Sequence, residues 1–200
     1  MSLNTPTALD FPITGTGPLS SAVRALGYKR FADAAETVRA LPYGRVRDTE
    51  DLLAVLNEQK GTCSLKHRFL AALAHECGYT DVKLTLGLYE MSDKNTPGVG
   101  RVLDAAGIDA IPEAHCYLTY QGRRFDFTGL TPGHASPFDS LIEERNVSPS
   151  ELTSVKVAFH RDALAQWAKL HHVDPDRAWQ LREECIRLLS NPRPTRTRAR

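Results

Sequence analysis

The sequence predicts an α+β fold in which a helix that begins with a cysteine packs on a small antiparallel sheet. Apolar residues recur at helical spacing after Cys63, which predicts that helix. Apolar and polar residues then alternate over residues 82–89, and two strand-like stretches flank a Gln-Gly pair at 121–122, as in a hairpin. Helical patterns precede and follow this core, so we expect flanking N- and C-terminal helices.

The N-terminal part of the chain is predicted to form an extended arm followed by short helices. Residues 1–20 are rich in Thr, Pro, Gly and Ser, and their prolines and glycines interrupt any regular element, so an extended arm is expected. The apolar residues of 20–41 suit one or two helices with a break near Gly27. A second short helical run is predicted over residues 48–57.

The segment 63–77 has the clearest helical pattern in the sequence. Gly78 follows it, where a C-terminal stop is expected. Residues 82–89 are predicted as a strand that starts a small sheet. Residues 91–113 form a long insert with a predicted helix over 99–106, and we expect this insert to border the site and gate access to it.

The predicted hairpin determines whether His115, expected to open its first strand, can meet Asp126 on the second. A two-residue turn at 121–122 pairs Tyr120 with Arg123 and places His115 and Asp126 on one face, two residues apart along one strand. A turn one residue longer, without a bulge, would place them on opposite faces. The other face carries apolar and aromatic residues that suit a core.

The C-terminal part is predicted to form one more strand and two helices. Residues 153–159 are expected as the strand, after a loop with a short helical stretch. The helices are expected at 162–171 and 175–189, with Asp174 as the cap of the second. Residues 191–200 are rich in Pro and Arg and lack apolar anchors, which predicts a disordered basic tail.

Composition predicts one domain over residues 21–190. A chain of 200 residues with 42% hydrophobic content can bury one substantial core. Its net charge of +1 includes four arginines in residues 191–200, and without them 21 basic residues face 24 acidic ones, which gives −3. This charge balance outside the last ten residues does not indicate a surface that binds nucleic acid. Four widely spaced cysteines in a chain of this size are expected to be reduced thiols.

No sequence feature indicates membrane association or export. No segment approaches the roughly 20 apolar residues that cross a bilayer, and no basic stretch at the N-terminus precedes an apolar run. We therefore expect a cytoplasmic protein with neither membrane nor specific nucleic acid as a partner. The sequence does not indicate an oligomeric state.

Cys63, His115 and Asp126 form the candidate catalytic set. A thiol is an effective nucleophile only as the thiolate, and the dipole and free amides of a helix start favour that anion. A histidine alongside can take the thiol proton and later protonate the leaving group, while a carboxylate orients the imidazole. The simpler alternative is a small buried cysteine with two solvent-facing strand residues.

An oxyanion formed at this site needs preorganised hydrogen-bond donors. The backbone amide of Cys63 is the expected first donor. The side-chain amides of Asn57 and Gln59 are candidates for the second, although polar residues before a helix commonly form caps or turns.

A zinc site could be imagined on the helix that begins at Cys63, because His67, His75 and Cys77 follow along it. The spacing matches no compact pair of ligands, since His75 and Cys77 lie about 200° apart around a helix. We therefore expect neither a metal nor a cofactor.

Several short motifs resemble the transglutaminase-like family of the papain-like cysteine protease superfamily, over about residues 48–130. The similar stretches are Gly61-Thr62-Cys63, 69–73, Cys77-Gly78-Tyr79, 82–87, His115-Cys116-Tyr117 and Asp126-Phe127-Thr128. The resemblance implies a papain-like core, with Cys63 as nucleophile, His115 as base and then acid, and Asp126 as the group that orients the imidazole.

The chain also departs from the family pattern beside the histidine. The family commonly has a small residue and then tryptophan after its histidine, where this chain has Cys116 and Tyr117, and its histidine-to-aspartate stretch is often longer. Because that aromatic residue usually shapes the cleft, Tyr117 is a candidate for substrate binding. These departures concern the substrate and leave the mechanism unchanged.

The predicted function is a cysteine hydrolase or acyltransferase that acts on a peptide or protein substrate, with amide hydrolysis favoured over crosslinking. The alternative is a catalytically inactive transglutaminase-like domain that binds a protein or peptide through the same groove. A third interpretation, an adaptor for membranes or nucleic acids, would depend on the basic tail and would be lost on deletion of residues 191–200.

Overall fold

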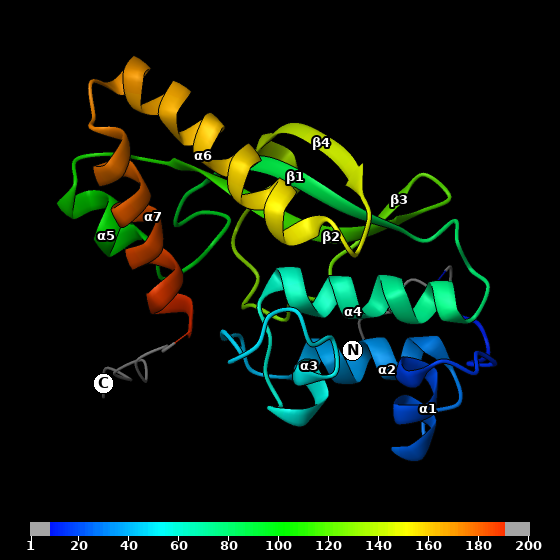
Figure 1. Cartoon of the computed structure of the whole chain (residues 1–200). Coiled ribbons are helices and arrows are strands. Elements are labelled where there is room, and N and C mark those ends of the chain that lie inside the picture. Colours follow the sequence, from blue (N-terminus) through cyan, green and yellow to red (C-terminus); the bar gives the residue numbers. More distant parts are fainter. Residues whose placement is uncertain (1–8, 191–200) are drawn as a thin grey trace, which may run out of the picture. The chain divides into compact units, whose positions relative to one another are not determined.

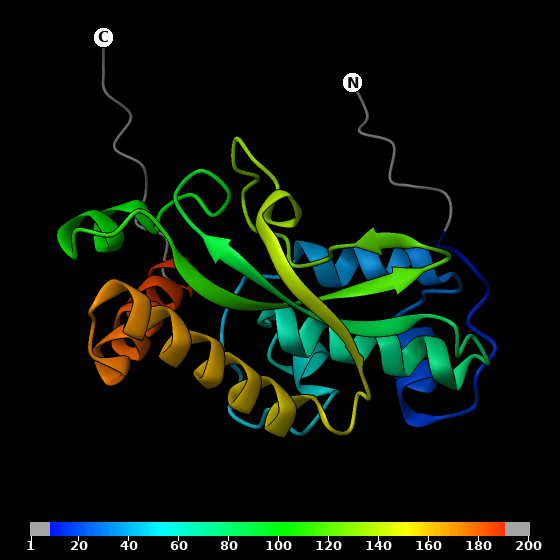
Figure 2. The same ribbon diagram turned by 90° about the horizontal axis from the view of Figure 1, so that it is seen from above.

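The computed structural model describes residues 9–190 and has a mixed α+β architecture (Figures 1 and 2). Helices accompany a four-stranded antiparallel sheet, which confirms the predicted α+β class, while the papain-like core stays a prediction. Residues 1–8 of the predicted arm and the whole predicted tail, 191–200, lie outside the described residues.

The chain divides into two compact units that interleave along the sequence. Among the described residues, the first unit contains 9–87, 115–129 and 144–156, and the second contains 88–114, 130–143 and 157–190. All the residues of the candidate site belong to the first unit. The single domain over 21–190 stays a prediction.

Three short helices of the first unit lie against a longer one. Helices α1 (Pro18–Ala25) and α2 (Phe31–Ala40) form on either side of Gly27, as predicted. Helix α3 (Ala54–Asn57) occupies only the end of the predicted 48–57 run. The reason is local, because aspartate side chains in that run accept hydrogen bonds from backbone amides two residues on, which competes with helix formation.

Helix α4 (Cys63–Glu76) confirms the clearest helical prediction. It contacts α1, α2 and α3, and Figure 1 shows it between those helices and the strands of the first unit. Phe69, Leu70 and Leu73 are fully buried, as the helical spacing of apolar residues implies. The helix ends before Gly78, whose φ of 86° suits the left-handed conformation of a helix stop.

The sheet has the strand order β3-β2-β1-β4. Its strands are β1 (Lys83–Met91), β2 (Ile111–Tyr120), β3 (Arg123–Phe125) and β4 (Leu141–Val147). The prediction that His115 opens a strand was wrong, since β2 begins four residues earlier. Those earlier residues include a charged one, Glu113, which is nevertheless buried because Arg182 binds its carboxylate.

The hairpin between β2 and β3 confirms the predicted register. Tyr120 pairs with Arg123 in an antiparallel ladder. Gln121 and Gly122 both have positive φ, 48° and 73°, as a two-residue turn of the I′ type requires. The register then places His115 and Asp126 on one face.

Two predictions in the C-terminal half were wrong. Residues 153–159 are not a strand but the start of α6 (Leu152–His171), in which the buried residues Leu152, His160 and Leu164 recur at helical spacing. Strand β4 was not predicted, because its middle residues are all exposed and give no alternating pattern.

The second unit has its own apolar core. Helix α5 (Gly100–Ala105) forms within the insert, close to the predicted 99–106, and packs on α7 (Pro175–Ser190). A short 3₁₀ helix, η1, covers Pro137–Ser140. Asp174 caps α7, as predicted, by accepting a hydrogen bond of 2.9 Å from the amide of Arg177. The gating role of the insert stays a prediction.

The core of the second unit is built from residues of β1, β2, α5, α6 and α7 and the segments between them. Its buried members are Tyr89, Met91, Val99, Leu103, Ile111, Leu164, Trp167, Ala168, Ala178, Leu181 and Cys185. Within residues 9–190, none of the helices has both the length and the apolar character that a membrane span requires.

Candidate active site

Cys63 is the first residue of α4 and lies at an open helix start. The preceding Thr62 is extended and its side chain makes no capping hydrogen bond, so the first amides of the helix remain directed at the site. A Cβ added at Gly61 would lie 3.0 Å from the Lys66 side chain and 3.1 Å from that of Val55, so a larger residue there would make those side chains shift. The cysteine itself is only 4% exposed.

The structure brings His115 and Asp126 into direct contact with each other, beside Cys63. His115 Nε2 lies 2.7 Å from Asp126 Oδ2, and the imidazole is close enough to Cys63 for the two side chains to shift each other's pKa. The other carboxylate oxygen, Oδ1, accepts bonds from the amide of Thr128 at 2.8 Å and from its hydroxyl at 2.5 Å. The carboxylate is therefore held in one orientation beside the imidazole.

Charges in this cluster favour a thiolate paired with an imidazolium. The pKa of Cys63 lies well below its usual value because the Cys116 thiol donates a hydrogen bond to it, and because Lys156 and His115 add positive charge. Burial alone would lower the pKa of His115, but the charge of Asp126 and its hydrogen bond raise it to about 10. Burial would raise the pKa of Asp126, yet the imidazolium holds it far below its usual value.

Cys116 is a hydrogen-bond donor that sequence reasoning assigned only to the core face of the hairpin. Burial raises the pKa of its own thiol, so it stays protonated beside the Cys63 thiolate. Its sulfur also lies 3.6 Å from Ser64 Oγ. The Cys116 thiol has a single proton, so it can donate a hydrogen bond to the Cys63 thiolate only while it remains protonated.

Replacing Cys116 with alanine should therefore raise the pKa of Cys63 and slow its alkylation by about 3- to 10-fold at pH values below that pKa, since one hydrogen bond to a charged group is lost. C116S keeps a donor and should lie closer to the wild type. The measurement is the rate of iodoacetamide alkylation at Cys63, followed by peptide mass mapping. Equal rates for C116A and the wild type would show that this thiol does not stabilise the anion.

His67 is a second missed residue, which the sequence suggested only as an imagined metal ligand. The amide of Phe127 donates to His67 Nε2 at 2.7 Å, so this nitrogen carries no proton, and Nδ1 donates to the carbonyl of Cys63 at 2.8 Å. Burial lowers the pKa of His67, which keeps it neutral. The ring thus ties the nucleophile turn to the residue that follows Asp126. Its position four residues after Cys63 on one helix was the available signal.

Lys66 fixes the same two segments from the other side of α4. Its buried ammonium donates to the carbonyl oxygens of Leu41 at 2.6 Å, Thr128 at 2.8 Å and Arg39 at 3.2 Å. Burial lowers its pKa to about 8. Nothing in the sequence distinguishes this lysine from a solvated one, because its partners are backbone groups of distant segments.

Lys156 is the fourth missed residue, and it contacts the reacting sulfur from a different helix, α6. Its Nζ lies 2.8 Å from Ser64 Oγ and 3.6 Å from Cys63 Sγ. Because residues 153–159 were predicted as a strand, the direction of this side chain could not be inferred from the sequence.

The remaining candidates lie apart from the sulfur. The Gln59 side chain donates to the carbonyl of Leu56 in its own turn, Asn57 is exposed, and neither amide is hydrogen-bonded to Cys63 in the described chain. Tyr117 is fully buried and its hydroxyl donates to Glu144 at 2.5 Å. Within residues 9–190, the hydrogen bonds of the Gln59 and Tyr117 side chains described above go to groups other than the reacting sulfur.

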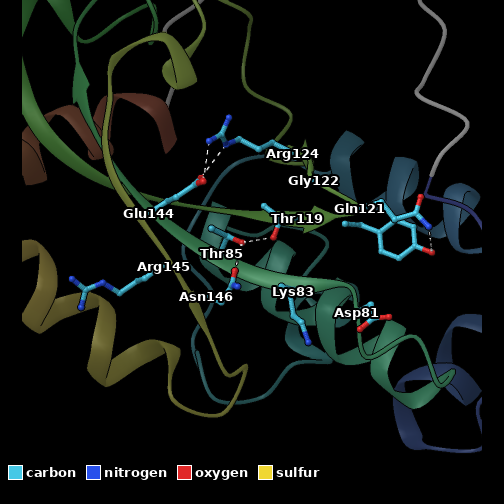
Figure 3. Close-up of a pocket in the computed structure, with 11 residues that line it drawn as sticks. Asp81, Lys83, Thr85, Thr119, Gln121, Gly122, Arg124, Glu144, Arg145 and Asn146 are labelled. Atoms are coloured by element: carbon cyan, nitrogen blue, oxygen red, sulfur yellow. Dashed lines mark hydrogen bonds and ion pairs between the residues drawn. The ribbon is translucent and has the colours of Figure 1, made fainter.

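A polar pocket of about 460 Å³ lies elsewhere on the first unit (Figure 3). Thr85 links Thr119 and Asn146 by hydrogen bonds of 2.8 and 3.0 Å at its floor, and Arg124 pairs with Glu144 at its side. The lining residues are Asp81, Lys83, Thr85, Thr119, Tyr120, Gln121, Gly122, Arg124, Glu144, Arg145 and Asn146. None of the candidate catalytic residues is among them, so this pocket is separate from the cysteine cluster.

The cluster has the parts that thiol-based acyl transfer requires: an anionic sulfur, a proton carrier, an orienting carboxylate and a free helix start. Comparisons of this chain with models of protein families, with curated proteins and with solved structures found no match. The support for this chemistry therefore comes from the geometry of the cluster.

Proposed function

We propose that this protein is a cysteine-dependent acyl-transfer enzyme that hydrolyses amide bonds in peptides or proteins. The observation that carries the proposal is the placement of the His115 ring, which lies beside Cys63 and has its Nε2 2.7 Å from Asp126 Oδ2. A histidine in this position can exchange a proton with the reacting groups at the sulfur, while Asp126 holds its Nε2 in place.

The proposed reaction has two stages. The Cys63 thiolate attacks the amide carbonyl, the charge moves to the carbonyl oxygen, and the His115 imidazolium protonates the leaving amine to give a thioester. His115, now neutral, then takes a proton from water, whose oxygen attacks the thioester and releases the acid and the thiolate. Water needs no binding site of its own, so hydrolysis is proposed in preference to transfer to an amine.

We further propose that the first unit has a papain-like, transglutaminase-like core. Support comes from the order of the elements: the cysteine starts a helix, the histidine lies on a following antiparallel strand, and the aspartate follows the next strand. The sequence resemblance over about residues 48–130 agrees with this order.

The burial of the sulfur favours one alternative, a catalytically inactive domain of the same kind that binds a peptide. Cys63 is 4% exposed and His115 9% exposed, so a substrate carbonyl reaches the sulfur only after a local opening. A binding domain would need no such opening, and its cysteine would not form a thioester.

An acyl-trapping experiment distinguishes the two functions. We expect the full chain to release nitrophenol from an activated acyl ester in a burst and to carry one acyl group on Cys63, located by peptide mapping. C63A should lose both signals, while C185A should keep them, because Cys185 is buried in the second unit with its pKa raised to about 12. A burst of equal size from C63A would reject the enzyme.

A further inference from the structure

The proposed mechanism leaves one charged contact of the nucleophile without a role. Lys156 lies on α6 and is half-buried, and its Nζ is 2.8 Å from Ser64 Oγ and 3.6 Å from Cys63 Sγ. The ammonium therefore lies beside the sulfur, at the start of the helix that carries it. A lysine in an ordinary surface position would instead extend into solvent.

The start of α6 is anchored to the helix that carries Cys63. Arg68, on α4, pairs with Glu50 at 2.9 Å, and the other carboxylate oxygen of Glu50 accepts from Thr153 at 2.8 Å. Leu152, at the first position of α6, is 1% exposed. The backbone of the first turn of α6 is thus held relative to α4, which makes the contact between Lys156 and Cys63 a built feature of the first unit.

The position of the ammonium matches both sites of negative charge in the reaction. Before attack the charge is on the sulfur, and after attack it is on the carbonyl oxygen of the carbon bonded to that sulfur. An ammonium within hydrogen-bond distance of the sulfur can reach the second position by a small rotation of its flexible stem. The backbone amide of Cys63 would be one oxyanion donor, and a second donor is needed because the Gln59 amide donates to Leu56 and the Asn57 side chain is exposed.

We propose that Lys156 is a further catalytic residue of this site, whose ammonium stabilises the thiolate of Cys63 before attack and the oxyanion after it. This role rests on the proposed acyl-transfer function. Ser64 then acts as a positioning residue, because its hydroxyl accepts from Lys156 and keeps the ammonium at the helix start.

The test must separate Lys156 from the other titratable groups around the sulfur. These are Lys66 and His67 on α4, His115 and Cys116 on β2, and Asp126 after β3. A comparison of two alkylating reagents does so, because iodoacetate is anionic and iodoacetamide is neutral. The ratio of their rates at Cys63 reports the local positive charge, which a purely structural role of Lys156 would not change.

The variants are K156M, K156R and, as a control on the same helix, K169M, whose lysine is exposed. In the full chain we expect K156M to raise the thiol pKa by about one unit, so that the iodoacetamide rate falls by about 10-fold at pH values below that pKa. The iodoacetate-to-iodoacetamide ratio should fall by about 3- to 10-fold. K156R keeps the charge and should preserve the ratio within about 3-fold. K169M should match the wild type, and circular dichroism checks the fold of each variant.

Two outcomes would overturn the role of Lys156, and they differ in what they say about the enzyme. If wild-type Cys63 reacts rapidly at pH 6 and K156M leaves both the thiol pKa and the ratio unchanged, the role of Lys156 is rejected and the acyl-transfer proposal stands. If wild-type Cys63 reacts no faster than an ordinary thiol, both proposals fail together. A ratio that falls in K156M but is kept in K156R supports the assignment.

Discussion

Replacing His115 with alanine should lower the rate at which iodoacetamide alkylates Cys63 at pH 6 by about 10- to 100-fold, because the thiol pKa then rises toward its ordinary value of about 8.5, although Cys116 and Lys156 remain beside it. In the wild type the imidazolium adds a positive charge beside the sulfur and lowers the pKa of the thiol. The measurement is a series of alkylation rates from pH 4 to 9. H134A is the matched control, since His134 is exposed and belongs to the second unit.

The same variant should change the shape of the pH dependence. The pKa of Cys63 is well below its usual value and that of His115 is about 10, so the thiolate–imidazolium pair persists between these two values. Hydrolysis by the wild type should therefore rise through the thiol pKa and fall as the pH approaches about 10, where the leaving group loses its proton donor. In H115A the hydrolysis rate should no longer rise and fall between these two pKa values. Superimposable alkylation profiles for H115A and the wild type would mean that the imidazole does not activate the sulfur.

The contact between His115 and Asp126 could be predicted because a short turn determines it. A two-residue turn at 121–122 fixes the pairing of Tyr120 with Arg123, and the alternation of side chains along the strands then places the two catalytic candidates on one face. Each step depends on neighbouring residues of one hairpin. Helix α4 was equally predictable, since its apolar residues repeat over its whole length.

The rest of the site depends on contacts between distant segments, which no local pattern contains. Lys156 reaches Cys63 because α6 begins at Leu152, whereas the β-branched residues after Leu152 favoured a strand. Tertiary contacts overrode that preference: Thr153 binds Glu50, 103 residues away in the chain. The same holds for Lys66, whose three partners are backbone carbonyl groups of distant segments, and side-chain types do not reveal such partners.

Replacing Asp126 with asparagine should lower hydrolytic turnover by about 100- to 10,000-fold, because the asparagine amide would disfavour the proton on His115 Nε2. The amide and hydroxyl of Thr128 both donate to Oδ1, so in D126N the carbonyl oxygen of the new side chain would occupy that position and its NH₂ would face His115 Nε2. Two N–H groups cannot face each other, so Nε2 would have to lose its proton and the imidazolium would be disfavoured. The alkaline limit of hydrolysis should fall from about 10 toward the ordinary histidine value of about 6.5 or below. D104N, an exposed aspartate of α5, should have no effect.

The same substitution should also change the pH dependence of stability. The pKa of His115 is raised in the folded state, so its pairing contributes below about pH 6.5 and is lost as the pH rises toward about 10. The pKa of Asp126 is lowered, so its pairing contributes above about pH 3.9 and is lost as the pH falls further. D126N should therefore be destabilised most between about pH 4 and 6.5, by about 2 kcal/mol for a pair whose carboxylate is 28% exposed. Urea unfolding of the wild type and D126N at about pH 5.5 and about pH 9.5 measures this difference in the free energy of unfolding. A difference of equal size at the two pH values would show that the pair is not ionised in the folded protein.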